Sequence, residues 1–244
     1  RPLYTDPEIK RTNLASVILR MLYLKLEEVD DFPFLETPEP SAIREGFKLL
    51  AELNALTHKR QLTDIGRQMA MLPVDTRYAR MLVTAASERC LREVLIIVSV
   101  LSIQDPREIS SENRQSALQK LAQFKHPESD FLGFVNLWNH YEKQRQDLSQ
   151  NQLRKYCKTH FLSFMRMREW REVHRQLLFS CQQMGFKSNK EPASYESIHR
   201  SIISGSLNQI ARQLEGKTYL GNRNRKISLF SSSVMSSAGA KWIV

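Results

Sequence analysis

Two clusters of basic residues carry the clearest sign of binding chemistry in this 244-residue sequence. Residues 154–175 hold seven Lys/Arg against two Glu, and residues 212–226 hold five against one. Side chains of this charge and density can neutralise the phosphates of a nucleic-acid backbone. We therefore predict phosphate contacts at Lys217, Arg223, Arg225, Lys226, Arg154, Lys155 and Lys158. A solvated face explains the 154–175 cluster equally well, whereas Gly221 would allow the run 221–226 to turn tightly against a phosphate.

Residues 211–218 are a relaxed match to the phosphate-binding P-loop. That loop needs a glycine where Ala211 stands, a strand before it and a helix after it. Here the preceding residues favour a helix and Tyr219-Leu220 favours a strand, which is the reverse order. We therefore predict a plain turn with an exposed Lys217, and no nucleotide or other cofactor site in this chain.

No metal site or nucleophile is predicted. Cys157 and His160 have a spacing that a metal could use, but a zinc site needs three or four ligands and no second pair is present. We expect a packed cysteine and a histidine at a helix edge. Ser231–Ser233 lack a His/Asp arrangement that could activate a hydroxyl, so we interpret them as a loop. The sequence predicts no catalytic residue.

Composition excludes several classes of protein. The chain is 41% hydrophobic with only 8 Gly and 9 Pro, which excludes low-complexity and disordered classes. Its densest apolar run, residues 94–101, is far short of the roughly 20 residues that cross a bilayer. Three widely spaced cysteines favour a reducing compartment, and we expect the cytoplasm. A net charge of +10 favours polyanion partners, and since residues 1–60 are nearly neutral, later segments should meet them.

The first 73 residues have the pattern of a winged helix. Thr12-Asn13 can cap a helix to about Leu26, and prolines after Phe32 end it. A second helix starts at Ser41, and Asn54 suits a left-handed helix end. Residues 58–61 resemble a hairpin tip. Thr63 or Asp64 then caps a short helix through Met71 that Pro73 stops.

From Val74 onward the pattern is a string of helices followed by short strands. Asp75 and Asp130 are the expected caps of two helices, and the others are expected over 91–103, 113–124, 149–158, 160–184 and 194–214. Five aromatics at helical spacing are expected in the core: Trp138, Tyr141, Phe161, Phe164 and Trp170. Strands are expected at 218–220, 226–230 and 241–244. The predicted fold class is mainly α, with a winged helix, a helical bundle and a partial β domain.

The order of short motifs resembles DEAH-box RNA helicases, most closely the bacterial HrpA type. The resemblance is carried by TDPEIKRTNL (5–14), FPFL (32–35), LTDIGR (62–67), LPVD (72–75), SIQDPR (102–107), ESDFL (128–132), REWREV (168–173), SLF (228–230) and KWIV (241–244). It covers essentially the whole chain. Thr76 and Asn54 depart from the family's usual Pro and Gly, at a cap and at a helix end.

The resemblance implies three parts: the end of the second RecA-like domain with a winged helix (1–73), a ratchet-like helical bundle (74–186), and a linker with an incomplete OB-fold (187–244). It implies a C-terminal fragment, because the P-loop, Asp-Glu-Ala-His and Gln-Arg-x-Gly-Arg motifs are missing from the sequence. The expected role is to wall an RNA channel and to couple RNA movement, 3′→5′, to motor domains that would use ATP and Mg. The alternatives are a helical protein-interaction adaptor and a winged-helix DNA-binding protein.

Overall fold

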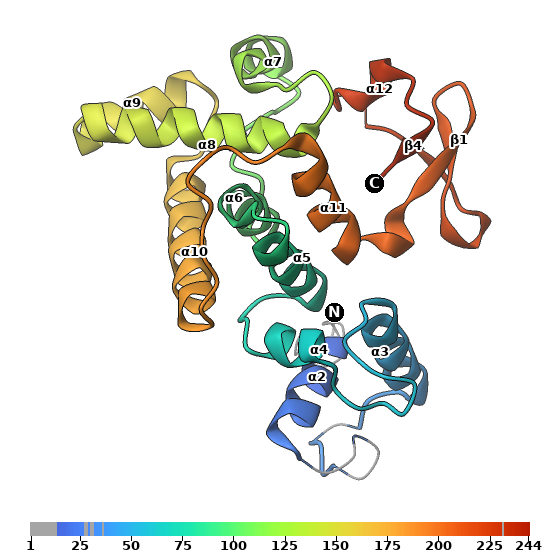
Figure 1. Ribbon diagram of the computed structural model, residues 1–244. Helices are drawn as coiled ribbons and strands as arrows, with labels where there is room; N and C mark the ends of the chain where they lie inside the picture. Colours follow the sequence, from blue (N-terminus) through green and yellow to red (C-terminus); the bar gives the residue numbers. More distant parts are fainter. Residues whose placement is uncertain (1–13, 27–28, 30–31, 36, 231) are drawn as a thin grey trace.

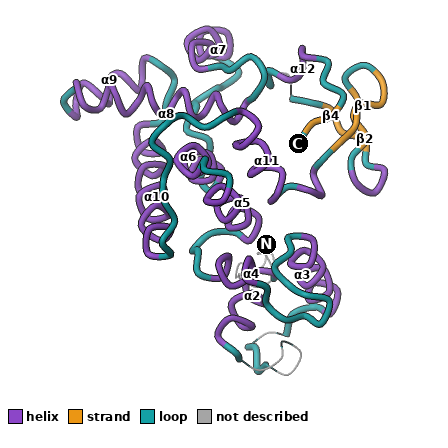
Figure 2. Tube along the Cα trace, in the orientation of Figure 1, coloured by secondary structure: helices purple, strands orange, loops and turns teal. Residues whose placement is uncertain are grey.

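The protein is mostly helical, with one small antiparallel sheet at its side (Figures 1 and 2). The computed structural model describes residues 14–26, 29, 32–35, 37–230 and 232–244. In Figure 1 the helices between residues 15 and 70 form a lower lobe, the following helices form the centre, and the sheet lies to the right. This confirms the mainly α fold class. Within the described residues, no helix combines the length and apolarity that a bilayer span requires.

The lower lobe contains α2 (Ala15–Leu24), α3 (Pro40–Glu52) and α4 (Asp64–Ala70). α3 begins at Pro40, one residue before the predicted start, because proline suits the first helical position, where its missing N–H costs nothing. The predicted caps Thr12 and Asn13 lie outside the described residues. Asn54 adopts the predicted left-handed conformation, with φ of 56°.

A short hairpin, the wing, connects α3 to α4. Leu56 and Leu62 form an antiparallel bridge on either side of the tip, where Arg60 has a φ of 57°. The Thr63 hydroxyl accepts a hydrogen bond from the Gly66 N–H at 3.0 Å and so caps α4. The predicted arrangement of helices, hairpin and cap is therefore confirmed for the described residues.

The central helices are α5 (Thr76–Ser87), α6 (Leu91–Leu101), α7 (Arg114–Leu121) with its 3-10 continuation η1 (Ala122–Phe124), α8 (Asp130–Asp147), α9 (Gln150–Thr159), α10 (Phe164–Gln183) and α11 (Tyr195–Gly205). The apolar helix α6 lies in the middle and packs against α5, α8 and α10 (Figure 1). Nearly all of its side chains are buried, which explains its continuous apolar run.

Two of the predicted helix starts are wrong. Ser129, not Asp130, caps α8, because its hydroxyl accepts the Leu132 N–H; the Asp130 carboxylate instead accepts hydrogen bonds from the Ser233 hydroxyl at 2.5 Å and the Val234 N–H at 3.1 Å. α10 starts at Phe164 rather than near 160, because Phe161 takes a φ of 55° and breaks the helix there.

An aromatic cluster joins α8 to α10 in the core. Trp170 is fully buried, and its ring centroid lies 5.0 Å from that of Trp138. Tyr141 is also buried, whereas Phe161 and Phe164 are only half-buried. The prediction that these aromatics belong to the core is confirmed for Trp138, Tyr141 and Trp170 and holds in part for Phe164, which packs against the core, whereas Phe161 lies in the turn before α10.

His174 should make the stability of this cluster depend on pH. Its ring lies 4.6 Å from that of Trp138, and burial lowers its pKa to about 4, an effect that Glu142 partly opposes. The unfolded chain, with an ordinary histidine pKa of about 6.5, therefore binds the proton more readily than the folded one. The contribution of His174 to stability should therefore fall as the pH drops below about 6.5, by about 2 kcal/mol between pH 7 and pH 5.

Urea titrations of the wild-type chain and of His174→Gln at pH 7 and pH 5 measure this contribution. The substitution should remove about 2 kcal/mol of the pH-dependent loss, whatever it costs at pH 7. Equal pH dependence in the two proteins would show that His174 titrates normally in the fold.

The sheet contains β1 (Ala211–Glu215), β2 (Thr218–Leu220), β3 (Lys226–Ser228) and β4 (Trp242–Ile243), in the order β3-β2-β1-β4 with antiparallel neighbours. The short elements η2 (Leu207–Gln209), η3 (Asn222–Asn224) and α12 (Met235–Ala238) lie between and beside these strands. An OB-fold is a five-stranded barrel, so this sheet agrees with that expectation only in part.

The predicted helix over 194–214 is wrong in its last part. α11 ends at Gly205, and residues 211–215 form β1, which pairs on one side with β2 and on the other with β4. The pairing with β2 extends to Glu215, and the pairing with β4 covers Ala211 and Arg212. Pairing with distant strands therefore overrides the local preference of this segment for helix.

Candidate nucleic-acid interface

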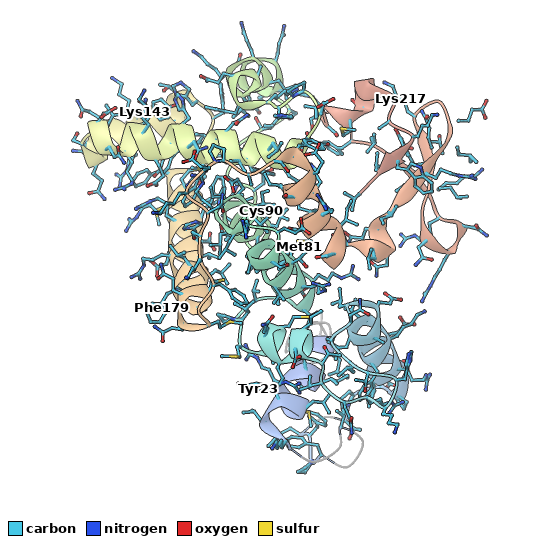
Figure 3. All side chains as sticks on the ribbon, viewed as in Figure 1. Tyr23, Met81, Cys90, Lys143, Phe179 and Lys217 are labelled. Atoms are coloured by element: carbon cyan, nitrogen blue, oxygen red, sulfur yellow. The ribbon has the colours of Figure 1, made fainter. Side chains whose placement is uncertain are left out.

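Lys217 lies at the tip of the β1–β2 hairpin, at the outer edge of the molecule (Figure 3). Gly216 beside it has a φ of 52°, which the turn requires and which glycine adopts without strain. The Lys217 side chain is exposed, as predicted. The segment is a hairpin between two strands: the strand after it was predicted, whereas the helix predicted before it is replaced by β1.

The loop after β2, which runs from Gly221 to Lys226 at the start of β3, holds three of the predicted contact residues. Its tightness comes from Arg223 and Asn224, with φ of 56° and 58°, and not from Gly221, whose φ of −90° any residue can adopt. The Gly221 N–H donates to the Arg225 carbonyl at 2.9 Å, and this hydrogen bond closes the loop. The side chains of Arg223, Arg225 and Lys226 are all exposed.

The helical cluster is divided between internal contacts and exposed cations. Arg171 pairs with Glu142 at 2.6 Å, Arg175 pairs with Glu172 at 2.8 Å, and Arg166 donates to the Asp105 carbonyl at 3.0 Å. The three residues that were singled out remain exposed on α9: Arg154, Lys155 and Lys158. Arg154 places its guanidinium 5.3 Å from the centre of the Phe164 ring.

The structure does not bring the two clusters together. In Figure 1, α9 lies at one end of the central helices and the sheet lies at the opposite side. Figure 3 shows the same separation between Lys143, at the α9 end of α8, and Lys217 on the hairpin. A single short segment of nucleic acid could therefore contact only one of them.

A cleft between α3 and the loop after β2 was not predicted from the sequence. It has a volume of about 570 Å³, and its lining includes Glu45, Lys48 and Glu52 of α3 and Arg223 and Arg225 of the loop. Arg223 Nη2 lies 3.3 Å from Glu45 Oε1 and joins the two walls. The spacing of the α3 residues, at i, i+3 and i+7, indicates one helix face, but no sequence signal indicates what that face meets.

In the part of the chain that the structure describes, no set of metal ligands surrounds Cys157. This side chain is fully buried, and burial raises the pKa of its thiol to about 11, whereas His160 stacks on Tyr156 with ring centroids 3.9 Å apart. Among the described residues, no three His, Cys, Asp or Glu side chains are grouped in a way that could hold a metal ion. Ser231 lies outside the described residues, and the Ser233 hydroxyl donates a hydrogen bond to the Asp130 carboxylate.

Two family models match the chain: the winged-helix part of the helicase-associated domain (HA2) over residues 47–74, and its ratchet-like part over residues 75–134. The ATP-dependent RNA helicase HrpA of Escherichia coli is 44% identical over 250 residues, which is 100% of this chain and 19% of the relative. The HrpA homolog of Haemophilus influenzae is 43% identical, with the same coverage. The chain is an HA2-containing region of the HrpA-type DEAH-box RNA helicase family.

This HrpA-type region spans about a fifth of the length of the two bacterial relatives. The likeness extends to an animal protein, the ATP-dependent RNA helicase DHX33 of Drosophila melanogaster, which is 30% identical over 95% of the chain and 33% of the relative. The resemblance inferred from the motifs is therefore confirmed. The relatives are named as ATP-dependent enzymes, and this HrpA-type region is one segment of such proteins.

Proposed function

We propose that this region is the RNA-channel and coupling module of an ATP-dependent 3′→5′ RNA helicase. Its partners are single-stranded RNA, read without sequence preference, and the RecA-like motor domains of its own protein, which bind ATP and Mg. In this proposal the protein acts in the cytoplasm. Three units carry the role: the end of the second RecA-like domain with the winged helix (1–73), the ratchet-like bundle (74–186) and the linker with the incomplete OB-fold (187–244).

The exposed basic loop after β2 is the observation that carries the proposal. Arg223, Arg225 and Lys226 extend from four consecutive positions of a loop that its own backbone hydrogen bond closes, so three cations are presented close together. Such a surface suits a phosphate backbone, which carries charge at every nucleotide, better than it suits base edges. Contacts of this kind are tolerant of sequence and sensitive to salt.

The winged helix offers little to a major groove. Arg67, the strong base-reading candidate of α4, pairs with Asp64 at 2.6 Å and donates to the Leu62 carbonyl. Arg60 of the wing lies over the ring of Phe47, 4.4 Å from its centre. α4 thus carries a single cation, Arg67, whereas the loop after β2 presents three, which disfavours the winged-helix DNA-binding alternative.

Neutralising the loop should flatten the salt dependence of RNA binding. In the triple variant Arg223→Gln, Arg225→Gln, Lys226→Gln, the slope of log K against log salt for a single-stranded oligonucleotide should fall by up to about 2, since each lost phosphate contact contributes about 0.7. Fluorescence anisotropy with a labelled U15 RNA between 50 and 200 mM salt measures both slopes.

A control variant that loses the same charge distinguishes the effect of lost phosphate contacts from the effect of a lower net charge. Lys120, Lys143 and Lys187 are exposed and lie outside both predicted sites, so their replacement by glutamine removes the same charge. This control variant should keep most of the slope of log K against log salt. An unchanged slope in the loop variant would exclude the loop as the contact surface, and an adaptor would show no salt-dependent RNA binding at all.

A further inference from the structure

The cleft between α3 and the loop after β2 has cations on both walls. Lys48 is exposed on α3, and Arg223 and Arg225 are exposed on the loop. The volume of the cleft, about 570 Å³, falls within the range of sites that hold ligand-sized groups. Cations from two separate elements therefore converge on the same space, beside the carboxylates of Glu45 and Glu52 on the α3 wall.

One of these cations is already paired, but weakly. Arg223 and Glu45 are 3.3 Å apart, and their side chains remain 66% and 64% exposed. An ion pair in water contributes little, because the solvent screens it and two long side chains must be held in place. A phosphodiester offers oxygens that a guanidinium can bind in a bidentate fashion, and it also attracts the neighbouring cations of the cleft. It can therefore displace the single carboxylate.

We infer that this cleft is a binding site for the phosphodiester backbone of single-stranded RNA, in which Lys48 adds a contact and Glu45 competes with the RNA for Arg223. The inference rests on the proposed function, since it assumes that the loop meets RNA. It adds the winged helix to the RNA-binding surface. In addition, Glu45 of α3 pairs with Arg223 when RNA is absent.

Glu52 provides a matched control for the competition. It lies two turns further along α3 and lines the same cleft, but within the described residues the ion pair to Arg223 is formed by Glu45. Glu45→Gln and Glu52→Gln therefore remove equal charge from one helix face. Only the first of them releases Arg223.

Binding of labelled U15 RNA to the chain at about 50 mM salt tests the inference. Glu45→Gln should bind about two- to fivefold more tightly than wild type, the range expected when an exposed ion pair no longer has to be broken. Glu52→Gln should gain less. In an Arg223→Gln background, Glu45→Gln should gain no more than Glu52→Gln. Lys48→Gln should weaken binding and reduce the salt slope by about 0.7.

The outcomes separate the two proposals. Equal gains from Glu45→Gln and Glu52→Gln, both retained in the Arg223→Gln background, would overturn the competition. RNA binding that is unchanged by Lys48→Gln and Arg223→Gln but weakened by Lys226→Gln, which does not line the cleft, would overturn the cleft and leave the loop as an RNA contact. Absence of salt-dependent RNA binding in the wild-type chain would overturn the proposed function itself. Circular dichroism confirms that each variant, changed only at exposed positions, is folded.

Discussion

Replacing Trp170 with alanine should lower the free energy of unfolding by about 3–5 kcal/mol, the usual cost of removing a large buried aromatic side chain. Trp170 of α10 is fully buried against α6. Its indole N–H donates to the Ile96 carbonyl at 3.0 Å and to the Ser99 hydroxyl at 2.9 Å. Alanine would leave a cavity and remove the donor shared by these two groups. A urea titration followed by circular dichroism measures the loss.

Two further substitutions divide this cost into its parts. Trp170→Phe keeps most of the apolar volume but loses the N–H, and should cost about 1–3 kcal/mol. Phe179→Ala changes an aromatic of the same helix that is 61% exposed, and should stay within about 0.5 kcal/mol of wild type (Figure 3). An alanine variant at position 170 within 1 kcal/mol of wild type would show that the α6–α10 contact is not a main source of stability.

Local signals in the sequence predicted much of the fold because they act over a few residues. Asn54 adopts the left-handed helix end, Thr63 caps α4, and the Asp75 carboxylate caps α5 by accepting the Arg77 N–H at 2.8 Å. Each of these depends on side-chain chemistry within three positions. The apolar run over 91–103 likewise indicated a helix, and nearly all side chains of α6 are buried.

Interactions between distant residues explain the failures. Asp130 has the chemistry of a helix cap, but the chain around Ser233 occupies its carboxylate, and Ser129 takes the capping position. Residues 211–215 carry no strong strand preference and become β1 because β2 and β4 lie on either side. Neither β2 nor β4 can be identified as a partner of β1 without knowing how the chain folds back beside it.

The same limit applies to the candidate site. Charge alone indicated the loop residues Arg223, Arg225 and Lys226, since a cluster of cations is visible in the sequence. The cleft was invisible, because Glu45 and Arg223 are 178 positions apart and meet only through the packing of the helices between them. That packing centres on α5, which follows the winged helix, and α11, which leads into the sheet (Figure 1).

Gly205 allows α11 to approach α5 closely, and Gly205→Ala should be the second strongly destabilising substitution. A methyl group at this position would lie 2.3 Å from the Arg77 carbonyl oxygen of α5, and also within contact of Met81. Because the first of these is backbone, relief requires the two helices to separate. We expect a loss of about 1–3 kcal/mol or more, the cost of overpacking a tight core. Urea titration measures it.

Gly133→Ala is the matched control, with the opposite sign expected. This glycine lies inside α8, and an added methyl would meet the Phe124 carbonyl oxygen at an ordinary 3.5 Å. Removing glycine from a helix interior should stabilise the protein by about 0.5–1 kcal/mol. If both alanines stabilise the protein, the close α5–α11 approach is wrong. If only Gly205→Ala destabilises it, α5 and α11 pack as closely as the structure shows. That variant should then also bind RNA less tightly, since separating α5 from α11 moves the loop away from α3.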